Sequence, residues 1–271
     1  MNTRTNISQL IYNRILENKE QLKLQFENTK NSIGYFFVDE LLPEELANEL
    51  YLKFPKIEDT KKRKNLREYK YVAFQMNKYS SVLEETLYAF QDKKVVNLIG
   101  EICNLPNLEP DEFLYAGGLS LMGKGNFLNP HLDNSHDKDL QRWRVLNLLY
   151  YVTPNWELEN GGNLELWPQG MQKSQTTIES KFNRLVVMAT HQKSWHSVSK
   201  VIKNDTRCCI SNYYFSQSPI LISDSFHITT FRGRPNERIK NVLLIFDSKI
   251  RSFVRKIFKK GIRENPHQYK K

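Results

Sequence analysis

With 271 residues, 39% of them hydrophobic, the chain can bury a full core, and it is long for one minimal domain. It has only three cysteines (Cys103, Cys208 and Cys209), no apolar signal-peptide core near Met1, and no apolar run near the C-terminus longer than Val242–Phe246. These features exclude a disulfide framework and a membrane span, and they predict a soluble cytoplasmic protein. The net charge of +10 lies in residues 232–271, which hold thirteen basic and three acidic residues, whereas the first 231 residues hold 27 of each.

Helices are expected to dominate the first 110 residues or so. Apolar positions spaced among charges predict an amphipathic helix at Ile7–Thr29, and proline followed by acidic residues predicts a helix start at Pro43. The basic run Lys61–Arg67 is expected to be a loop. Two further helices are expected, from a cap at Ser80 or Ser81 to Phe90, and over Val95–Cys103.

From Leu114 to Phe215 strands are expected to dominate, as in an all-β unit. Alternation along Val145–Val152 places Asn147, Leu149 and Tyr151 on one face. The pair Gly161-Gly162 is interpreted as a turn requirement and not as a phosphate cradle, because no Lys-Ser or Lys-Thr follows it.

The pattern His131-Leu132-Asp133, with His196 further along the chain, indicates a metal site. Two imidazoles and one carboxylate can hold one face of Fe(II) and leave the other face open for an oxidising cosubstrate and O2. Arg207 starts an apolar strand, where a guanidinium needs a partner and can pair with a carboxylate at two points. The constellation predicts an iron oxygenase that consumes a dicarboxylic 2-oxo acid, with His191 as an alternative ligand.

The loop Asn134–Arg142 follows this pattern directly and is placed to cover the site. Its His136 and Asp137 are expected to be exposed loop residues, with metal or substrate binding as the alternative. Tyr213 shares a strand face with Arg207, so it is expected either to wall the pocket or to pack in the core.

Five ordered segments between about Tyr35 and Pro219, about two thirds of the chain, resemble the prolyl-4-hydroxylase-like Fe(II)/2-oxoglutarate oxygenases. They are a strand and capped helix at Gly34–Leu46, the His131-Leu132-Asp133 dyad, the strand and turn Arg144–Trp156, the Gly-Gly-x-Leu strand Gly161–Trp167, and His196-Ser197-Val198 with Arg207. The combination is specific to the superfamily and not to a substrate.

The resemblance implies a double-stranded β-helix, the cupin-like jelly roll, with supporting N-terminal helices, so that the whole chain is α+β and mainly β. It implies that His131, Asp133 and His196 are the catalytic iron ligands, with 2-oxoglutarate and O2 as cosubstrates and ascorbate as a candidate reductant. It also implies an oxidoreductase that hydroxylates a C–H bond and converts 2-oxoglutarate to succinate and CO2. Asp133 favours hydroxylation, because related halogenases lack a carboxylate at this position.

The same resemblance implies that Arg207 binds the C5 carboxylate of 2-oxoglutarate. Tyr151 matches a tyrosine that touches this carboxylate in some relatives, and Asn147 shares its strand face. Relatives often carry cosubstrate-binding tyrosines shortly before the His-x-Asp pattern, where this chain has Leu121 and Leu128. The substrate is expected to be a small polar molecule or a peptide.

The oxygenase domain is expected at residues 1–219, with a helical part to about 110 and the jelly-roll core at 111–219, followed by a basic extension at 220–271. Apolar residues recur at helical spacing from Ile239 to Phe258, and Gly261 is placed to end this helix. We expect the helix to pack its apolar stripe on the core and to expose its basic face.

The alternatives for this helix are an anionic membrane surface or an acidic partner, with nucleic acid least favoured. The alternatives for the whole chain are a non-catalytic jelly-roll binding protein and a nucleic-acid demethylase of the same chemistry.

Overall fold

The computed structural model describes residues 3–258 and 269. The helices are α1 (Arg4–Glu17), α2 (Lys19–Thr29), α3 (Glu44–Leu52), α4 (Ser81–Ala89), α5 (Lys93–Cys103) and α6 (Arg238–Ile257). The strands are β1 (Tyr35–Val38), β2 (Lys61–Lys64), β3 (Glu68–Ala73), β4 (Glu109–Pro110), β5 (Gly118–Met122), β6 (Phe127–Leu132), β7 (Trp143–Tyr151), β8 (Leu164–Leu166), β9 (Thr176–Ile178), β10 (Arg184–Ala189), β11 (His196–Val198), β12 (Arg207–Ser216) and β13 (Thr230–Phe231).

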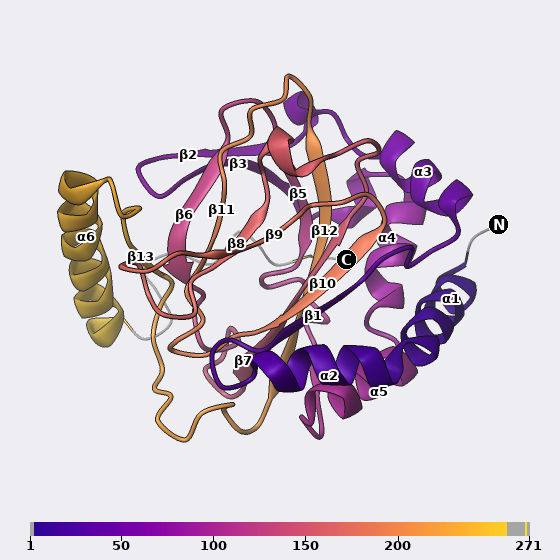
Figure 1. Cartoon of the computed structure of the whole chain (residues 1–271), viewed down its shortest axis with the longest axis horizontal. Coiled ribbons are helices and arrows are strands. Elements are labelled where there is room, and N and C mark those ends of the chain that lie inside the picture. The colour runs from indigo at the N-terminus through magenta and orange to yellow at the C-terminus, as the bar shows by residue number, and fades with distance from the viewer. Residues whose placement is uncertain (1–2, 259–268, 270–271) are drawn as a thin grey trace.

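The thirteen described strands join one antiparallel sheet that curls on itself (Figure 1). Their order is β1-β10-β7-β12-β5-β3-β6-β11-β8-β9, with β2 on β3, β4 on β12 and β13 on β6. Strands far apart in sequence thus become neighbours, as in β12, which lies between β7 and β5. The expected mainly β jelly-roll core with supporting helices is confirmed.

The N-terminal helices cover one face of this sheet, whereas α6 lies at the opposite edge of the molecule (Figure 1). Ile7, Ile11 and Ile15 recur every four residues on α1 and are fully buried, as the helical period requires. They belong to the same core cluster as Leu148 and Tyr150 of β7. Burial of this apolar interface fixes the sheet face that carries the helices and leaves the other face to enclose a cavity.

Two N-terminal predictions were wrong in detail. The helix expected over residues 7–29 is divided into α1 and α2 at Asn18, whose side-chain amide donates to the carbonyl of Arg14 at 2.8 Å and so competes with continuation of the helix. The basic run expected to be a loop begins as β2, which pairs with β3 from Lys61 opposite Val72. Four strands within the first 110 residues, β1 to β4, therefore belong to the sheet and not to a helical layer.

The C-terminal helix forms where its periodicity predicts, but its orientation is the reverse of the expected one. Leu244 is buried, whereas Ile239, Phe246 and Phe253 are exposed. The helix end expected at Gly261 lies outside the described residues. None of the described helices is both long and apolar enough to cross a membrane.

Candidate metal centre

A cavity of about 620 Å³ opens inside the curled sheet. Its lining comes from β3, β5, β6, β7, β11 and β12, and from α6. Asn147, Leu149 and Tyr151 of β7 point into it, as the alternation predicts, while Leu148 and Tyr150 point to the helices.

His131, Asp133 and His196 meet at one end of this cavity. Pairing of β11 with β6 sets His196 opposite His131, and their ring centroids are 4.1 Å apart. Asp133 follows β6 directly, with its Oδ1 3.6 Å from Nε2 of His131 and its Oδ2 3.8 Å from Nε2 of His196. One ligand atom from each of the three lies within 4.8 Å of the others, and no other such group of His, Cys, Asp or Glu was found within residues 3–258 and 269.

Backbone carbonyls fix the orientation of both histidine rings. Nδ1 of His131 lies 2.9 Å from the carbonyl oxygen of Asn129, and Nδ1 of His196 lies 2.9 Å from that of Ser194. Because a carbonyl only accepts, each Nδ1 carries the proton and each Nε2 presents a lone pair towards Asp133. Neutral imidazoles with free Nε2 atoms are the form that binds a metal.

The electrostatics of Asp133 and His196 favour metal-binding protonation states. Burial opposes ionisation of Asp133, but its contact with His131 and the charges of His196 and Arg144 hold its pKa well below the usual range. Burial and the neighbouring His131 lower the pKa of His196 to about 4. At neutral pH the site therefore holds a carboxylate beside a neutral imidazole. The Oδ2 of Asp133 is buried without a hydrogen-bond partner, as expected of an atom whose natural partner is a cation.

Arg207, Tyr151 and Asn147 also line the cavity. All three are buried, and the Arg207 Nε, the Tyr151 hydroxyl and the Asn147 Oδ1 have no hydrogen-bond partner. The Arg207 guanidinium carbon lies 5.2 Å from the Tyr151 ring centroid. Burial also raises the pKa of Tyr151, so its hydroxyl stays protonated as a donor. Buried, unsatisfied polar atoms around a guanidinium fit a bound carboxylate.

The Gly161-Gly162 turn packs closely against the Arg207 side chain. Both glycines have positive φ, +73° and +69°, a conformation that other residues avoid. A Cβ on Gly161 would lie 2.1 Å from the carbonyl oxygen of Lys200, and one on Gly162 would lie 3.1 Å from Cδ of Arg207. The interpretation of this pair as a turn requirement is confirmed.

Two cavity residues were missed by the sequence analysis. Phe231 of β13 stacks on His131 at 5.2 Å between ring centroids, through a pairing of β13 with β6 that local sequence does not signal. Arg144 lines the cavity although simple alternation from Asn147 would point it the other way. The pairing between β7 and β12 skips a residue at Val145, and this bulge reverses the alternation before it.

The remaining residues considered in the sequence analysis differ in whether they reach the cavity. Tyr213 lines the cavity and lies under the Arg144 guanidinium, 4.3 Å from its ring centroid. His191, the alternative ligand, is engaged elsewhere: its Nε2 lies 3.2 Å from the carbonyl of Ile33, and its Nδ1 accepts from the Lys193 amide. Leu128 lines the cavity, whereas Leu121 belongs to the core on the helix-bearing face.

The expectation that His136 and Asp137 are exposed was wrong. Both are buried, and His136 lines the cavity. The loop Asn134–Arg142 is held together by hydrogen bonds of Asp137, whose carboxylate accepts from Nε of Arg142 at 2.8 Å and from the Gln141 amide at 2.9 Å. This ion pair orders a segment whose polar composition predicts a solvated loop.

The buried His136 predicts a pH dependence of stability. Burial, and after it the charges of Arg144 and Arg255, lower the pKa of His136 to about 4. An unfolded chain takes up this proton near pH 6.5, so the free energy of unfolding falls as pH drops from about 6.5 to about 4. The His136→Gln variant should lose about 2 kcal/mol less than wild type between pH 7 and pH 5, measured by urea unfolding of the metal-free protein. Equal losses in the two proteins would contradict the burial of a neutral His136.

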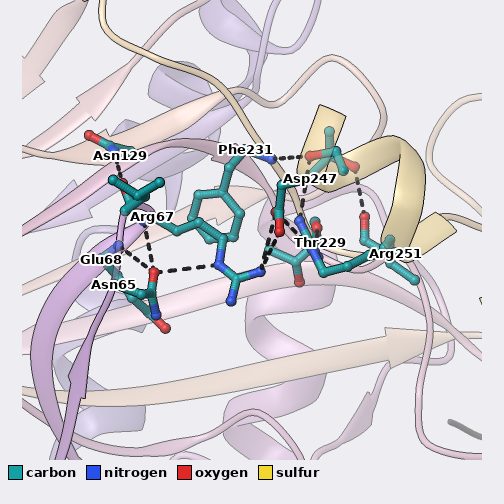
Figure 2. Close-up of polar contacts among 12 residues, drawn as sticks. Asn65, Arg67, Glu68, Asn129, Thr229, Phe231, Asp247 and Arg251 are labelled. Atoms are coloured by element: carbon teal, nitrogen blue, oxygen red, sulfur yellow. Dashed lines mark hydrogen bonds and ion pairs between the residues drawn. The ribbon is translucent and has the colours of Figure 1, made fainter. Parts of the chain in front are cut away.

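Helix α6 forms part of the cavity wall, and polar contacts hold it to Arg67, Thr229 and Phe231 (Figure 2). The Asp247 carboxylate accepts from Nη1 of Arg67 at 3.3 Å and from Nε of Arg251 at 2.9 Å. Arg251 also donates to the carbonyl of Thr229 at 2.8 Å. The hydroxyl of Ser248 accepts from the amide of Phe231 at 3.2 Å, so the helix holds the ring that stacks on His131.

Comparisons with known proteins agree with this geometry. The family model of the 2OG-Fe(II) oxygenase superfamily matches residues 117–215. Prolyl 3-hydroxylase OGFOD1 of Mus musculus is 32% identical over 88 residues, which are 31% of this chain and 16% of that protein. The chain therefore spans only a small part of the curated relative that it matches.

Solved structures share the fold. The Pseudomonas putida prolyl-4-hydroxylase has a TM-score of 0.54 at 16% identity, over 71% of this chain and 97% of that one. The prolyl hydroxylase of Trichoplax adhaerens, solved with a hypoxia inducible factor peptide, has a TM-score of 0.55 at 19% identity, over 78% and 96% of the two chains. Residues 117–215 are thus similar in sequence to the 2OG-Fe(II) oxygenase superfamily, and the fold is similar to that of these prolyl hydroxylases.

Proposed function

We propose that the chain hydroxylates a C–H bond of a polar substrate, with His131, Asp133 and His196 as the Fe(II) ligands. The observation that carries this proposal is the convergence of their three ligand atoms within 4.8 Å, in the cavity that also holds the unpartnered Arg207. Bound Fe(II), with 2-oxoglutarate and O2, supplies the oxidising chemistry and yields succinate and CO2.

The protein's own part in this reaction is to bind, orient and shield. The two imidazoles and the carboxylate would hold Fe(II) and would leave room on the metal for the cosubstrates. Arg207 pairs with the far carboxylate of the cosubstrate, because a buried guanidinium with a free N–H needs an anionic partner. We further propose that Tyr151 donates its hydroxyl to that carboxylate and that Asn147 completes the polar end of the cavity.

We propose that residues 1–219 are the oxygenase domain and that residues 220–271 are an extension that completes its cavity. Phe231 on His131 and the cavity-lining face of α6 support this second role. Because the extension reaches the metal site, its removal should alter the active site as well as the surface.

The charge of the cavity wall supports an acidic substrate. Beyond Asp133 and Arg207, the Lys, Arg, Asp and Glu side chains that line the cavity are cationic except for Glu68; the cations are Arg63, Arg67, Lys70, Arg144, Arg251 and Arg255. The Nε atoms of Arg144 and Arg255 are buried without hydrogen-bond partners. A carboxylate or phosphate on the substrate would satisfy them. Since the relatives include prolyl hydroxylases, proline peptides flanked by Asp or Glu are the first substrates to assay.

Arg255→Gln is expected to raise the apparent KM for such a substrate about tenfold, which corresponds to one lost charge-assisted hydrogen bond. The apparent KM for 2-oxoglutarate should not change, because that cosubstrate lies at Arg207. The matched control is Arg238→Gln, an exposed arginine of the same helix that does not line the cavity. If both variants behaved as wild type towards acidic substrates, the acidic-substrate assignment would be wrong.

The test of the proposed reaction is conversion of 2-oxoglutarate to succinate by the purified chain. We expect turnover to need both Fe(II) and O2 and to rise when a substrate is present. A chain that binds iron and 2-oxoglutarate but forms no succinate with any peptide or small-molecule substrate would instead support a non-catalytic binding protein.

A further inference from the structure

The outward face of α6 is a continuous apolar stripe. Ile239, Ile250 and Phe253 have exposed fractions of 82%, 63% and 65%. At 100° per residue, the stripe residues fall within one third of the helix circumference over all five turns. The members of this α6 stripe are Ile239, Val242, Leu243, Phe246, Ile250, Phe253 and Ile257. A helix of a globular protein normally turns such a stripe to the core, so this one is available to another surface.

The inward face of α6 explains why the stripe faces out. This face is held by polar contacts, those of Asp247 with Arg67 and Arg251 and that of Ser248 with Phe231 (Figure 2). Leu244 is its one fully buried apolar residue among those described. The orientation is therefore set by directional hydrogen bonds and ion pairs, which a rotation of the helix would break.

The charges around the stripe are positive. Arg238 and Lys249 are exposed along one edge of it, about 70–90° from its centre at 100° per residue. In the described part of residues 232–271 the acidic residues are already paired, Glu237 with Lys240 and Asp247 with Arg67 and Arg251. Residues 232–271 carry a net charge of +10. The outward side of α6 thus combines large apolar groups with uncompensated cations.

We propose that α6 is an interfacial helix that binds the surface of an anionic lipid bilayer. The stripe would enter the boundary between headgroups and acyl chains, and the cations beside it would contact lipid phosphates. Lying in the plane of the surface, a helix of twenty residues extends about 30 Å. A second copy of this chain is a poorer occupant, because a two-fold pairing of the stripes would bring the same cations together.

This binding would place at the lipid surface a helix that also lines the cavity. Val254 and Arg255 of α6 are among the lining residues. The proposal concerns a surface of the protein and does not depend on the proposed reaction.

Co-sedimentation of the full chain with lipid vesicles tests this inference. We expect binding to phosphatidylcholine vesicles that contain phosphatidylglycerol and much weaker binding to phosphatidylcholine alone. The double variant Phe246→Ser/Phe253→Ser keeps every charge, and we expect it to bind anionic vesicles about 100-fold more weakly, about tenfold for each phenylalanine. The matched control Leu24→Ser/Leu52→Ser removes two exposed leucines on α2 and α3 and should bind as wild type.

Two results would overturn the inference. One is equal binding of wild type and the Phe246→Ser/Phe253→Ser variant to anionic vesicles, which would mean that general electrostatic attraction suffices. The other is absence of vesicle binding together with a dimer in light scattering that the same variant dissociates, which would make the stripe a contact between copies. Unchanged succinate formation and thermal stability in the variant would show that neither folding nor the reaction causes the loss.

Discussion

Replacement of Asp133 by alanine is expected to lower the rate of succinate formation by more than about 100-fold. Mutation of a residue that only hydrogen-bonds to a metal ligand already lowers metal affinity or activity by about 10- to 100-fold, and loss of a ligand itself should have a larger effect. Asp133 supplies the anionic atom among the three proposed ligands, and its Oδ2 has no hydrogen-bond partner of its own. Its removal also leaves the buried Arg144, 3.8 Å away, without the nearby negative charge. Iron affinity, measured by anaerobic equilibrium dialysis, should fall together with turnover.

The matched control for this variant is Asp137→Asn. Asp137 is also buried and lies four residues further on, but it pairs with Arg142 and is not one of the three grouped side chains. We expect it to keep iron binding and to change turnover by a few fold at most. Full turnover of Asp133→Ala, with normal iron content, would refute the ligand assignment.

Arg207→Ala is expected to raise the apparent KM for 2-oxoglutarate by about 10- to 100-fold, the range for hydrogen bonds to a charged partner. The turnover number at saturating 2-oxoglutarate should change less, because Arg207 is not one of the three proposed metal ligands. Arg207→Lys should recover only part of the loss, since an ammonium cannot make the two-point pairing of a guanidinium. Steady-state kinetics with varied 2-oxoglutarate measure all three values.

Arg184→Ala serves as the control for losing a buried arginine. Arg184 is also buried in the same sheet, but it pairs with Asp39 outside the cavity. Its loss should lower thermal stability and leave the KM for 2-oxoglutarate unchanged. An unchanged KM in Arg207→Ala would move the cosubstrate carboxylate to another residue.

Local sequence patterns correctly predicted which strand residues share a face and where a glycine turn is required. Alternation along β7 correctly placed Asn147, Leu149 and Tyr151 on one face, which lines the cavity. The glycine pair at 161–162 was predicted because only glycine tolerates the positive φ and close backbone approach found there.

The parts that sequence could not supply depend on contacts between distant segments. Phe231 reaches His131 through a two-residue pairing of β13 with β6, which carries no periodic signal. Arg144 enters the cavity because of a bulge at Val145, whose position is set by the partner strand. His136 is buried because Asp137 pairs with Arg142 within the same loop.

The orientation of α6 was the largest error, and its cause is physical. Periodicity shows that one face of a helix is apolar, but it does not show which way that face turns. Here the polar side carries Asp247 and Ser248, which meet partners on the core. These directional contacts take precedence over burial of the stripe.

Anaerobic titration of the purified chain with Fe(II) and 2-oxoglutarate tests the central claim most directly. A 2-oxo acid that chelates iron through its 1-carboxylate and keto oxygen gives a weak visible charge-transfer band. We predict this band in wild type and its absence in His196→Ala, whose fold is checked by circular dichroism. Absence of the band in folded, iron-loaded wild type, or its persistence in His196→Ala, would contradict the proposed site.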